Sequence, residues 1–211
     1  MADGSGAVIR NITKDELYDA VAPDDFAAML EIDRHLNRST AFDKIISATH
    51  DHFWDPLDSK YIDFTEPFDM VGQQLMPDYL VPALETDYVR DHFADKPAEK
   101  IKFVNEMARW QLSAILHGEQ GALSLSASLC HVLRDPGAQE YAANQCREEG
   151  RHVTAFAKYI RARWGSPLPC GEVLATLLKE IVNAPEVYKK IVGMQMLVEG
   201  LAMGACSTIY P

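Results

Sequence analysis

Two long stretches in the second half of the sequence restrict the fold more than any other feature. Residues 97–134 contain no proline after Pro97 and no glycine before Gly118, and their apolar residues recur at helical spacing. Asp135-Pro136 ends this stretch, because the residue before a proline disfavours the helical conformation. Residues 137–164 form the second stretch, which Gly165 ends. The sequence therefore predicts two long helices in succession.

The rest of the chain also lacks the alternating pattern of strands. We expect a shorter helix over 171–182 and another from about 185 to the end. In the first half, Thr13 and Glu16 form a capping box before a helix at 17–21, and Pro23 opens a helix that continues to residue 36. Residues 50–70 are rich in Asp, Pro and aromatic residues without a helical period. The predicted fold class is all-α, with an N-terminal helical and irregular wrapping segment at 1–96 and a helical core at 97–211.

Composition narrows the class of protein. The chain has 211 residues, 47% of them apolar, with 20 basic and 31 acidic side chains and a net charge of -11. This apolar fraction indicates a packed globular protein, and the negative charge excludes wrapping of nucleic acid. The four cysteines show no C-x-x-C spacing, which favours a reducing compartment. With neither a signal peptide nor a run of about 18 apolar residues, a cytoplasmic protein without a membrane partner is expected.

The acidic residues are unevenly distributed, and those in the second half are few. Residues 1–100 hold 21 acids and 9 bases, whereas residues 101–211 hold 10 acids and 11 bases. Glu119 is the only acid between residues 107 and 134, and it shares a helical stripe with Leu112, Ile115, Leu116, Ala122 and Leu123. Glu199 is the only acid after residue 187 and has apolar neighbours. Because a buried carboxylate is costly without a cation, each is a candidate metal ligand.

The second long helix contributes a pair of potential ligands. Glu149 and His152 are three residues apart and so project from one helix face, and Glu148 and Arg151 lie beside that face. The inward stripe predicted for this helix consists of Tyr141, Gln145, Glu149, His152, Phe156 and Tyr159. A Glu-x-x-His pair facing a single inward Glu is typical of half of a dinuclear carboxylate site in a helical bundle. Carboxylate and imidazole ligands suit iron or manganese.

The ordered set Glu119, Glu149/His152 and Glu199 resembles the ferritin-like di-iron carboxylate superfamily, and most closely its arylamine N-oxygenase type. The resemblance covers residues 97–211. It implies two iron ions, or iron and manganese, with dioxygen as co-substrate, an electron-donor reductase, and hydroxylation or N-oxygenation of a small organic substrate. It also implies that Glu149 or Glu199 bridges the metals, that Glu119 is a terminal ligand and that His152 is the nitrogen ligand.

The sequence departs from that superfamily at one point. The superfamily pattern has a second acidic-x-x-His pair on a fourth helix, and Glu149/His152 is the only such pair in this chain. The sequence also ends in an apolar helical pattern, GLAMGACSTIYP. We therefore expect the fourth ligand-bearing helix to be absent from this sequence. It is either missing or supplied in trans, by another copy in a homo-oligomer or by a different chain, or the chain is part of something longer.

Two other functions are compatible with the same residues. One is a ferritin-type iron-handling protein or ferroxidase without an organic substrate, and the other is a metal-free helical interaction module. The glycines beside Glu119 and Glu199 indicate either room for a ligand or close packing of helices. His117, which points off the Glu119 stripe, is expected to be structural, and His50 and His52 are expected to be solvated. Arg147 and Arg151 are expected to face solvent. The residues expected to pack in the core are Met194, Met196, Met203, Tyr141, Tyr159, Trp110, Cys130, Cys146, Cys170 and Cys206.

Overall fold

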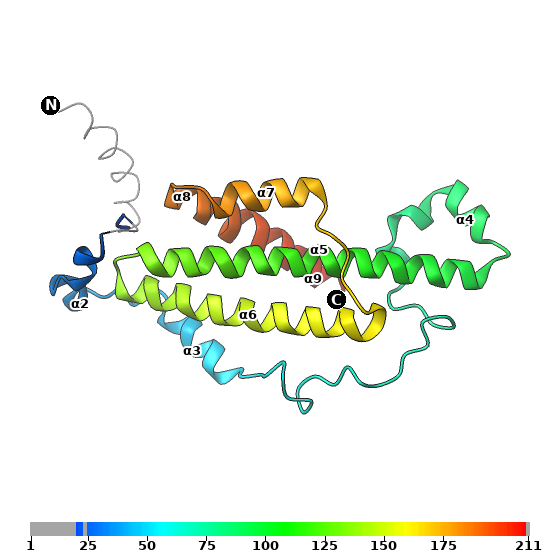
Figure 1. Cartoon of the computed structure of the whole chain (residues 1–211), viewed down its shortest axis with the longest axis horizontal. Helices are drawn as coiled ribbons and strands as arrows, with labels where there is room; N and C mark the ends of the chain where they lie inside the picture. The colour runs from blue at the N-terminus through cyan, green and yellow to red at the C-terminus, as the bar shows by residue number, and fades with distance from the viewer. Residues whose placement is uncertain (1–19, 23–24, 210–211) are drawn as a thin grey trace. The chain divides into compact units, whose positions relative to one another are not determined.

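The computed structural model describes residues 20–22 and 25–209, and within these residues the chain is helical. The two predicted long helices are confirmed as α5 (Pro97–Val132) and α6 (Pro136–Trp164), which a short turn joins (Figure 1). Asp135 begins α6 by accepting a hydrogen bond from the Ala138 amide (2.7 Å), and Gly165 ends it with a φ of +83°. The described residues contain no strand, only one isolated bridge between Ala20 and Leu133.

The first half of the chain is less regular than the second. The helical elements before α5 are η1 (Phe26–Leu30), α2 (Asp33–Leu36), α3 (Asp43–Asp51), η2 (Asp78–Leu80), η3 (Pro82–Glu85) and α4 (Asp87–Phe93). No helix occurs between α3 and η2, in agreement with the irregular segment predicted at 50–70. The predicted capping box of Thr13 and Glu16 lies outside the described residues.

The single helix predicted through residue 36 is wrong, because the chain breaks between η1 and α2. Arg34 explains the break. Its guanidinium donates to the backbone carbonyls of Met29 (2.8 Å) and Arg134 (2.9 Å) and to Gln139 Oε1 (2.8 Å). These bonds tie the α2 segment to the turn between α5 and α6, so tertiary contacts override the local helical pattern.

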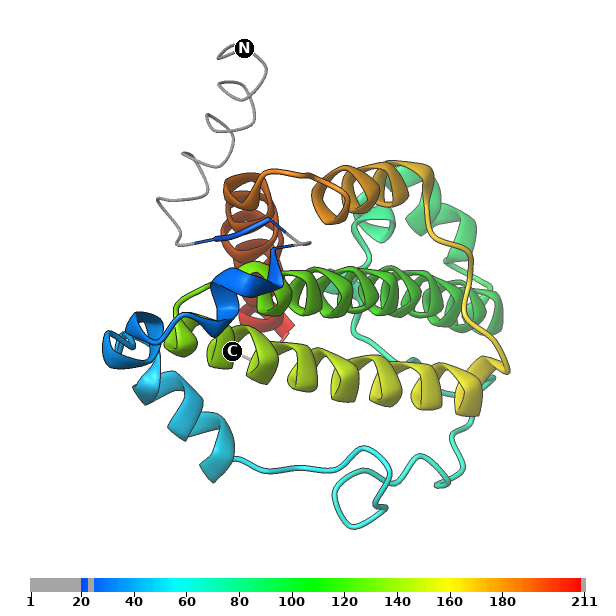
Figure 2. The same ribbon diagram turned by 60° about the vertical axis from the view of Figure 1, so that its left-hand side comes forward.

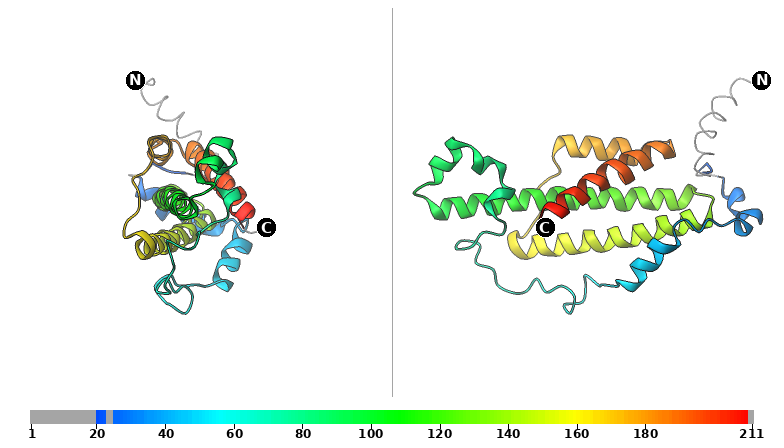
Figure 3. Two further views of the ribbon diagram at one scale, coloured as in Figure 1. Left: turned by 90° about the vertical axis from the view of Figure 1, so that its right-hand side faces the viewer. Right: turned by 180° about the vertical axis from the view of Figure 1, so that it is seen from behind.

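The C-terminal part matches the predicted helices but contains a feature that periodicity did not indicate. α7 spans Glu172–Val182, and α8 (Val187–Lys190) and α9 (Glu199–Ile209) are joined without interruption by η4 (Ile191–Val198), which is a π-helix. Figure 3 shows α8, η4 and α9 as one continuous helix. π-Helical turns inside α-helices are rare and frequently lie at functional sites. Glu199 is the first residue after the π-helix η4.

The chain divides into two compact units that are both built on α5 and α6. Unit 1 contains the described residues up to Trp54, together with Glu119–Arg151 and the residues from Ala175 onward. Unit 2 contains Asp55–Gly118 and His152–Leu174. This division differs from the predicted boundary between 96 and 97, which stays a prediction about domains.

In unit 1, α3 packs beside the first half of α6 (Figure 2). The Phe42 and Tyr141 rings stack with their centroids 5.0 Å apart, and Thr49 hydrogen-bonds Asn144 Oδ1 (3.0 Å). Leu125 of α5 is fully buried, as is Met194 of η4. The contacts with Phe42 and Thr49 hold the first half of α6, which carries Glu149, against the α3 segment.

The glycines near the predicted ligands have two different roles. A Cβ on Gly121 would lie 2.7 Å from Leu178 Cδ2, so Gly121 allows α7 to approach α5 closely. Cβ atoms on Gly118, Gly200 and Gly204 would meet nothing within 4 Å. Close packing therefore explains Gly121, and open space surrounds the others.

In unit 2, Val81 and Leu84 form a buried cluster with Val104 of α5. Asn105 holds the preceding loop: its side-chain amide donates to the carbonyls of Met70 (2.9 Å) and Gln73 (3.0 Å), and its Oδ1 accepts from the Leu75 amide (2.8 Å). The loop is therefore fixed to α5 by three hydrogen bonds of one buried side chain.

None of the helices in the described part of the chain combines the length and apolar character that crossing a bilayer requires.

Lys190 is a buried cation in unit 1. Only 9% of its surface is exposed, and Nζ donates to Ser128 Oγ (3.1 Å) and to the Val182 carbonyl at the end of α7. Burial lowers the pKa of the Lys190 ammonium below its usual value of 10.5, because the charged form loses its hydration. The charge thus opposes folding at neutral pH while its hydrogen bonds favour it.

This burial predicts a pH-dependent stability. The penalty is complete at pH values below the folded-state pKa of Lys190 and disappears as the pH rises toward the unfolded-state pKa. The free energy of unfolding of the native chain, relative to Lys190→Met, is therefore expected to increase between pH 7 and about pH 9.5. Urea unfolding at both pH values measures it. Lys189→Met is the control, because Glu186 raises the pKa of exposed Lys189 and no change is expected over this range. An equal pH trend for both variants would contradict the assignment.

Candidate metal centre

Three of the four predicted ligands come together in the structure. One ligand atom each from Glu119, Glu149 and His152 lies within 4.8 Å of the other two. Glu119 comes from α5, and Glu149 and His152 lie one turn apart on the uninterrupted helix α6, as their spacing predicts. Glu149 is 6% exposed, and Glu119 and His152 are half-buried.

The chemistry of these ligand atoms fits a divalent transition metal. Two carboxylates this close repel each other, and burial of Glu149 strengthens the repulsion. A bound cation replaces that repulsion by attraction to both carboxylates. Oxygen and imidazole ligands together suit iron, manganese or zinc more than magnesium or calcium, which prefer oxygen alone.

A chain of amide side chains supports the buried carboxylate. Gln195 Nε2 donates to Gln145 Oε1 (2.7 Å), and Gln145 Nε2 donates to Glu149 Oε1 (3.2 Å). Gln145 lies one turn before Glu149 on α6, and Gln195 lies in the π-helix η4, one turn before Glu199. The chain therefore fixes one oxygen of the buried ligand and links it to the helix that carries Glu199.

Glu199 is not one of the three grouped residues. It is half-buried at the start of α9, immediately after η4. Burial raises the pKa of Tyr141, and the negative charges of Glu199 and Glu149 raise it further. Both carboxylates thus act on one phenol, although the structure assembles the ligand group without Glu199.

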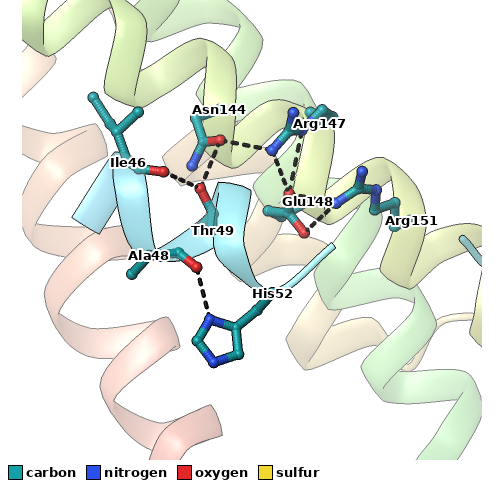
Figure 4. A network of polar contacts seen from close by, with 8 residues as sticks. All are labelled: Ile46, Ala48, Thr49, His52, Asn144, Arg147, Glu148 and Arg151. Atoms are coloured by element: carbon teal, nitrogen blue, oxygen red, sulfur yellow. Dashed lines mark hydrogen bonds and ion pairs between the residues drawn. The ribbon is translucent and has the colours of Figure 1, made fainter. Parts of the chain in front are cut away.

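The flank of α6 beside the ligands carries a polar network (Figure 4). Glu148 accepts hydrogen bonds from Arg147 (3.0 Å) and, through both oxygens, from Arg151 (2.7 and 3.0 Å). Arg147 also donates to Asn144, the residue that binds Thr49 of α3. This network lies on the same turns of α6 as Glu149 and His152 and fixes the side chains beside them.

The predicted solvent exposure of Arg151 is wrong. Its side chain is only 13% exposed, because it is paired with Glu148 and stacks over the Phe53 ring at 4.8 Å. Arg147 is exposed, as expected, but shares the same carboxylate. The network uses these arginines to hold Glu148 rather than leaving them free for an acidic substrate.

The other histidines have the roles expected of them. His117 Nε2 lies 2.9 Å from the Leu168 carbonyl, which is a structural contact. His50 and His52 are exposed, and His52 Nδ1 hydrogen-bonds the Ala48 carbonyl (2.8 Å; Figure 4). None of the three belongs to the group of potential ligands found in the described residues.

The methionines beside Glu199 only partly match the prediction of core residues. Met194 is fully buried, but Met196 is 65% exposed and Met203 is 74% exposed. Trp110 is also exposed. Met196 lies within η4 and Met203 follows it, so both stand where the π-helix has changed the helical phase of the chain.

We expect Gln145 to control metal affinity. Gln145→Leu keeps the approximate volume but removes the donor to Glu149 and the acceptor for Gln195. Loss of such an outer partner is expected to weaken metal binding by about 10–100-fold. Mn²⁺ binding followed by electron paramagnetic resonance gives the dissociation constant. Gln120→Leu is the control, since Gln120 is exposed on α5 and its side-chain amide donates to Ser124 Oγ. Equal affinity in Gln145→Leu and the native chain would refute the role.

Comparison with known proteins gave no match: no family model, no curated protein and no solved structure is significantly similar to this chain. The functional argument therefore depends on the site itself.

Proposed function

We propose that the chain is a ferritin-like metalloprotein that uses non-haem iron to activate dioxygen. The observation that carries the proposal is the group of Glu119, Glu149 and His152 on two packed helices. Carboxylates with one imidazole are the ligand type of dinuclear iron or iron/manganese sites in helical bundles. When bound, such metals supply the redox chemistry that transfers oxygen to an organic substrate.

The residues of the chain have distinct tasks in this proposal. His152 would supply the nitrogen ligand, and Glu119, Glu149 and Glu199 would supply carboxylate ligands. Gln145 orients Glu149 through the hydrogen bond at 3.2 Å, and burial of Glu149 limits access of water to the centre. The proposed partners are a small organic substrate, hydroxylated or N-oxygenated, and an electron-donor reductase.

The proposal requires further ligands to complete a dinuclear site. Three carboxylates and one imidazole are fewer than the four carboxylates and two imidazoles of the bundle sites with two Glu-x-x-His pairs. In this proposal the remaining ligands come from a further helix, for which a second copy of the chain is one source. Analytical ultracentrifugation with and without iron tests this part separately from metal binding.

Anaerobic loading with ferrous iron tests the metal site. After removal of free iron, we expect about one to two bound iron ions per chain in the native protein. We expect much less bound iron in Glu149→Ala and His152→Ala. Glu180→Ala and His131→Ala are matched controls, because both side chains are exposed on other helix surfaces. Less than about half an iron per chain, unchanged by Glu149→Ala, would contradict the proposal.

Oxygen uptake by the iron-loaded protein tests the reaction class. With a chemical reductant, an oxygenase consumes dioxygen over many turnovers, whereas a ferroxidase stops when its added ferrous iron is oxidised. Light scattering adds a second criterion, since a storage protein assembles into a large cage. A single stoichiometric uptake with cage assembly would replace the oxygenase by a ferritin-type function. Melting temperatures that do not respond to iron or manganese would favour a metal-free interaction module.

A further inference from the structure

Unit 2 contains a cavity that the metal centre does not use. Its volume is about 590 Å³, and its walls come from the start of α5, the end of α6 and the loop before η2. The lining residues lie 13 or more positions before Glu119 or at least 11 after His152 in the sequence. This volume is in the range of small-molecule sites in proteins.

Two residues that line the cavity each carry a buried N–H group with no acceptor among the described residues. They are Nε of Arg163 and Nε1 of Trp164, adjacent residues at the end of α6. Buried N–H groups are almost always paired, because an unpaired donor costs about 1–3 kcal/mol. Two adjacent unpaired N–H groups beside one cavity mark these two side chains as candidates for contact with a ligand.

Contacts on other sides hold the Arg163 guanidinium in this wall. Its Nη1 donates to the Glu66 carbonyl (2.8 Å), and the guanidinium carbon lies 5.4 Å from the centroids of both the Phe68 and Tyr159 rings. The group is thus fixed in place while Nε has no partner. A fixed guanidinium is suited to a planar acceptor such as a carboxylate.

The charges around the cavity favour a monoanion. Glu99 lies 4.0 Å from His92, and Glu106 lies 3.5 Å from Arg109. Within the described part of the chain, neither Lys102 nor Arg163 forms an ion pair with a carboxylate. The two glutamates disfavour a dianion such as phosphate, while the two cations favour a single negative charge.

Apart from Asn105, whose amide is bonded to the loop, the remaining lining is apolar. Met70, Val71 and Ala98 and the ring of Trp164 contribute hydrocarbon surface beside the charged groups. We propose that this cavity binds a small monocarboxylic acid, with its carboxylate at Arg163 and Trp164, near Lys102, and its apolar body against the loop. The proposal is independent of the metal centre and of its reaction.

Benzoate is the probe, and the indole N–H signals of the ¹⁵N-labelled full chain are the readout. The chain has three tryptophans, and Trp164→Phe identifies the signal of Trp164. Benzoate is expected to shift that signal in a saturable manner and to leave Trp54 and Trp110 unchanged. Benzamide has the same shape without the charge and is expected to bind at least about tenfold more weakly.

Variants separate binding from folding. Arg163→Lys keeps the charge but removes Nε, and is expected to weaken benzoate binding about tenfold. Lys102→Met changes an exposed side chain and is expected to weaken binding several-fold without loss of structure. Arg161→Met, two residues before Arg163 and exposed, is the control and should leave affinity unchanged. Absence of a saturable Trp164 shift, equal binding of benzamide, or tighter binding of inorganic phosphate would each overturn the proposal.

Discussion

Replacing Glu149 by glutamine is expected to raise the melting temperature of the metal-free protein and to abolish the further rise that Mn²⁺ produces in the native chain. In the metal-free protein, Glu149 is 6% exposed and its carboxylate lies within 4.8 Å of that of Glu119. Glutamine has nearly the same shape without the charge, so the repulsion disappears. One substitution therefore raises the melting temperature of the metal-free protein and removes the stabilisation by Mn²⁺.

The size of the metal effect follows from mass action. At a free Mn²⁺ concentration about 100 times the dissociation constant, binding stabilises the native chain by about 2.7 kcal/mol. Glu149→Gln removes a charged ligand and should remove most of this gain. Differential scanning fluorimetry with a chelator and then with Mn²⁺ measures both effects. Mn²⁺ is suitable because it is not readily oxidised by air.

Glu180→Gln is the control for this experiment. Glu180 is exposed on α7 and is not one of the grouped ligands. It should melt as the native chain does, with and without Mn²⁺. A fall in melting temperature of metal-free Glu149→Gln, together with an unchanged Mn²⁺ response, would show that Glu149 is a structural residue.

Leu125→Ala is expected to cause the largest loss of stability outside the metal centre. Leu125 of α5 is 0% exposed in unit 1. Removal of its side chain loses the transfer free energy of three carbons and leaves a cavity that the surrounding helices fill only partly. The expected decrease in the free energy of unfolding is about 2–5 kcal/mol, measured by urea denaturation.

Leu177→Ala provides the matched comparison. Leu177 lies on α7 in the same unit but is 45% exposed. The same chemical change should therefore decrease the free energy of unfolding by less than about 1 kcal/mol. Similar losses in both variants would indicate that Leu125 does not lie in a close-packed core.

The long helices were predictable because their signals are local. α5 and α6 begin and end within about three residues of the predicted limits, since Asp135-Pro136 and Gly165 act on the backbone directly. The grouping of Glu119, Glu149 and His152 was also predictable, because a carboxylate in an apolar stripe must face a neighbouring helix.

Other parts of the site could not be predicted from local patterns. Gln145 was placed on the inward stripe, but its bonds to Glu149 and Gln195 depend on how two helices far apart in sequence pack. The break before α2 depends on Arg34 reaching the turn after α5. The buried position of Arg151 depends on Phe53, which precedes it by nearly 100 residues.

The π-helix η4 sets the direction in which Glu199 leaves its helix. Each residue of an α-helix turns the chain by about 100°, and a π-helix turns it less per residue because its hydrogen bonds span five residues rather than four. Over the eight residues Ile191–Val198, this difference changes the azimuth of everything that follows. Glu199, the only acid after residue 187, directly follows this segment and so takes up the whole change in azimuth. Deleting one residue from this segment would rotate Glu199 by somewhat less than about 100° relative to α8 while leaving composition and apolar character almost unchanged. The direction in which the Glu199 side chain points therefore depends on the length of this segment as well as on its own position in the sequence.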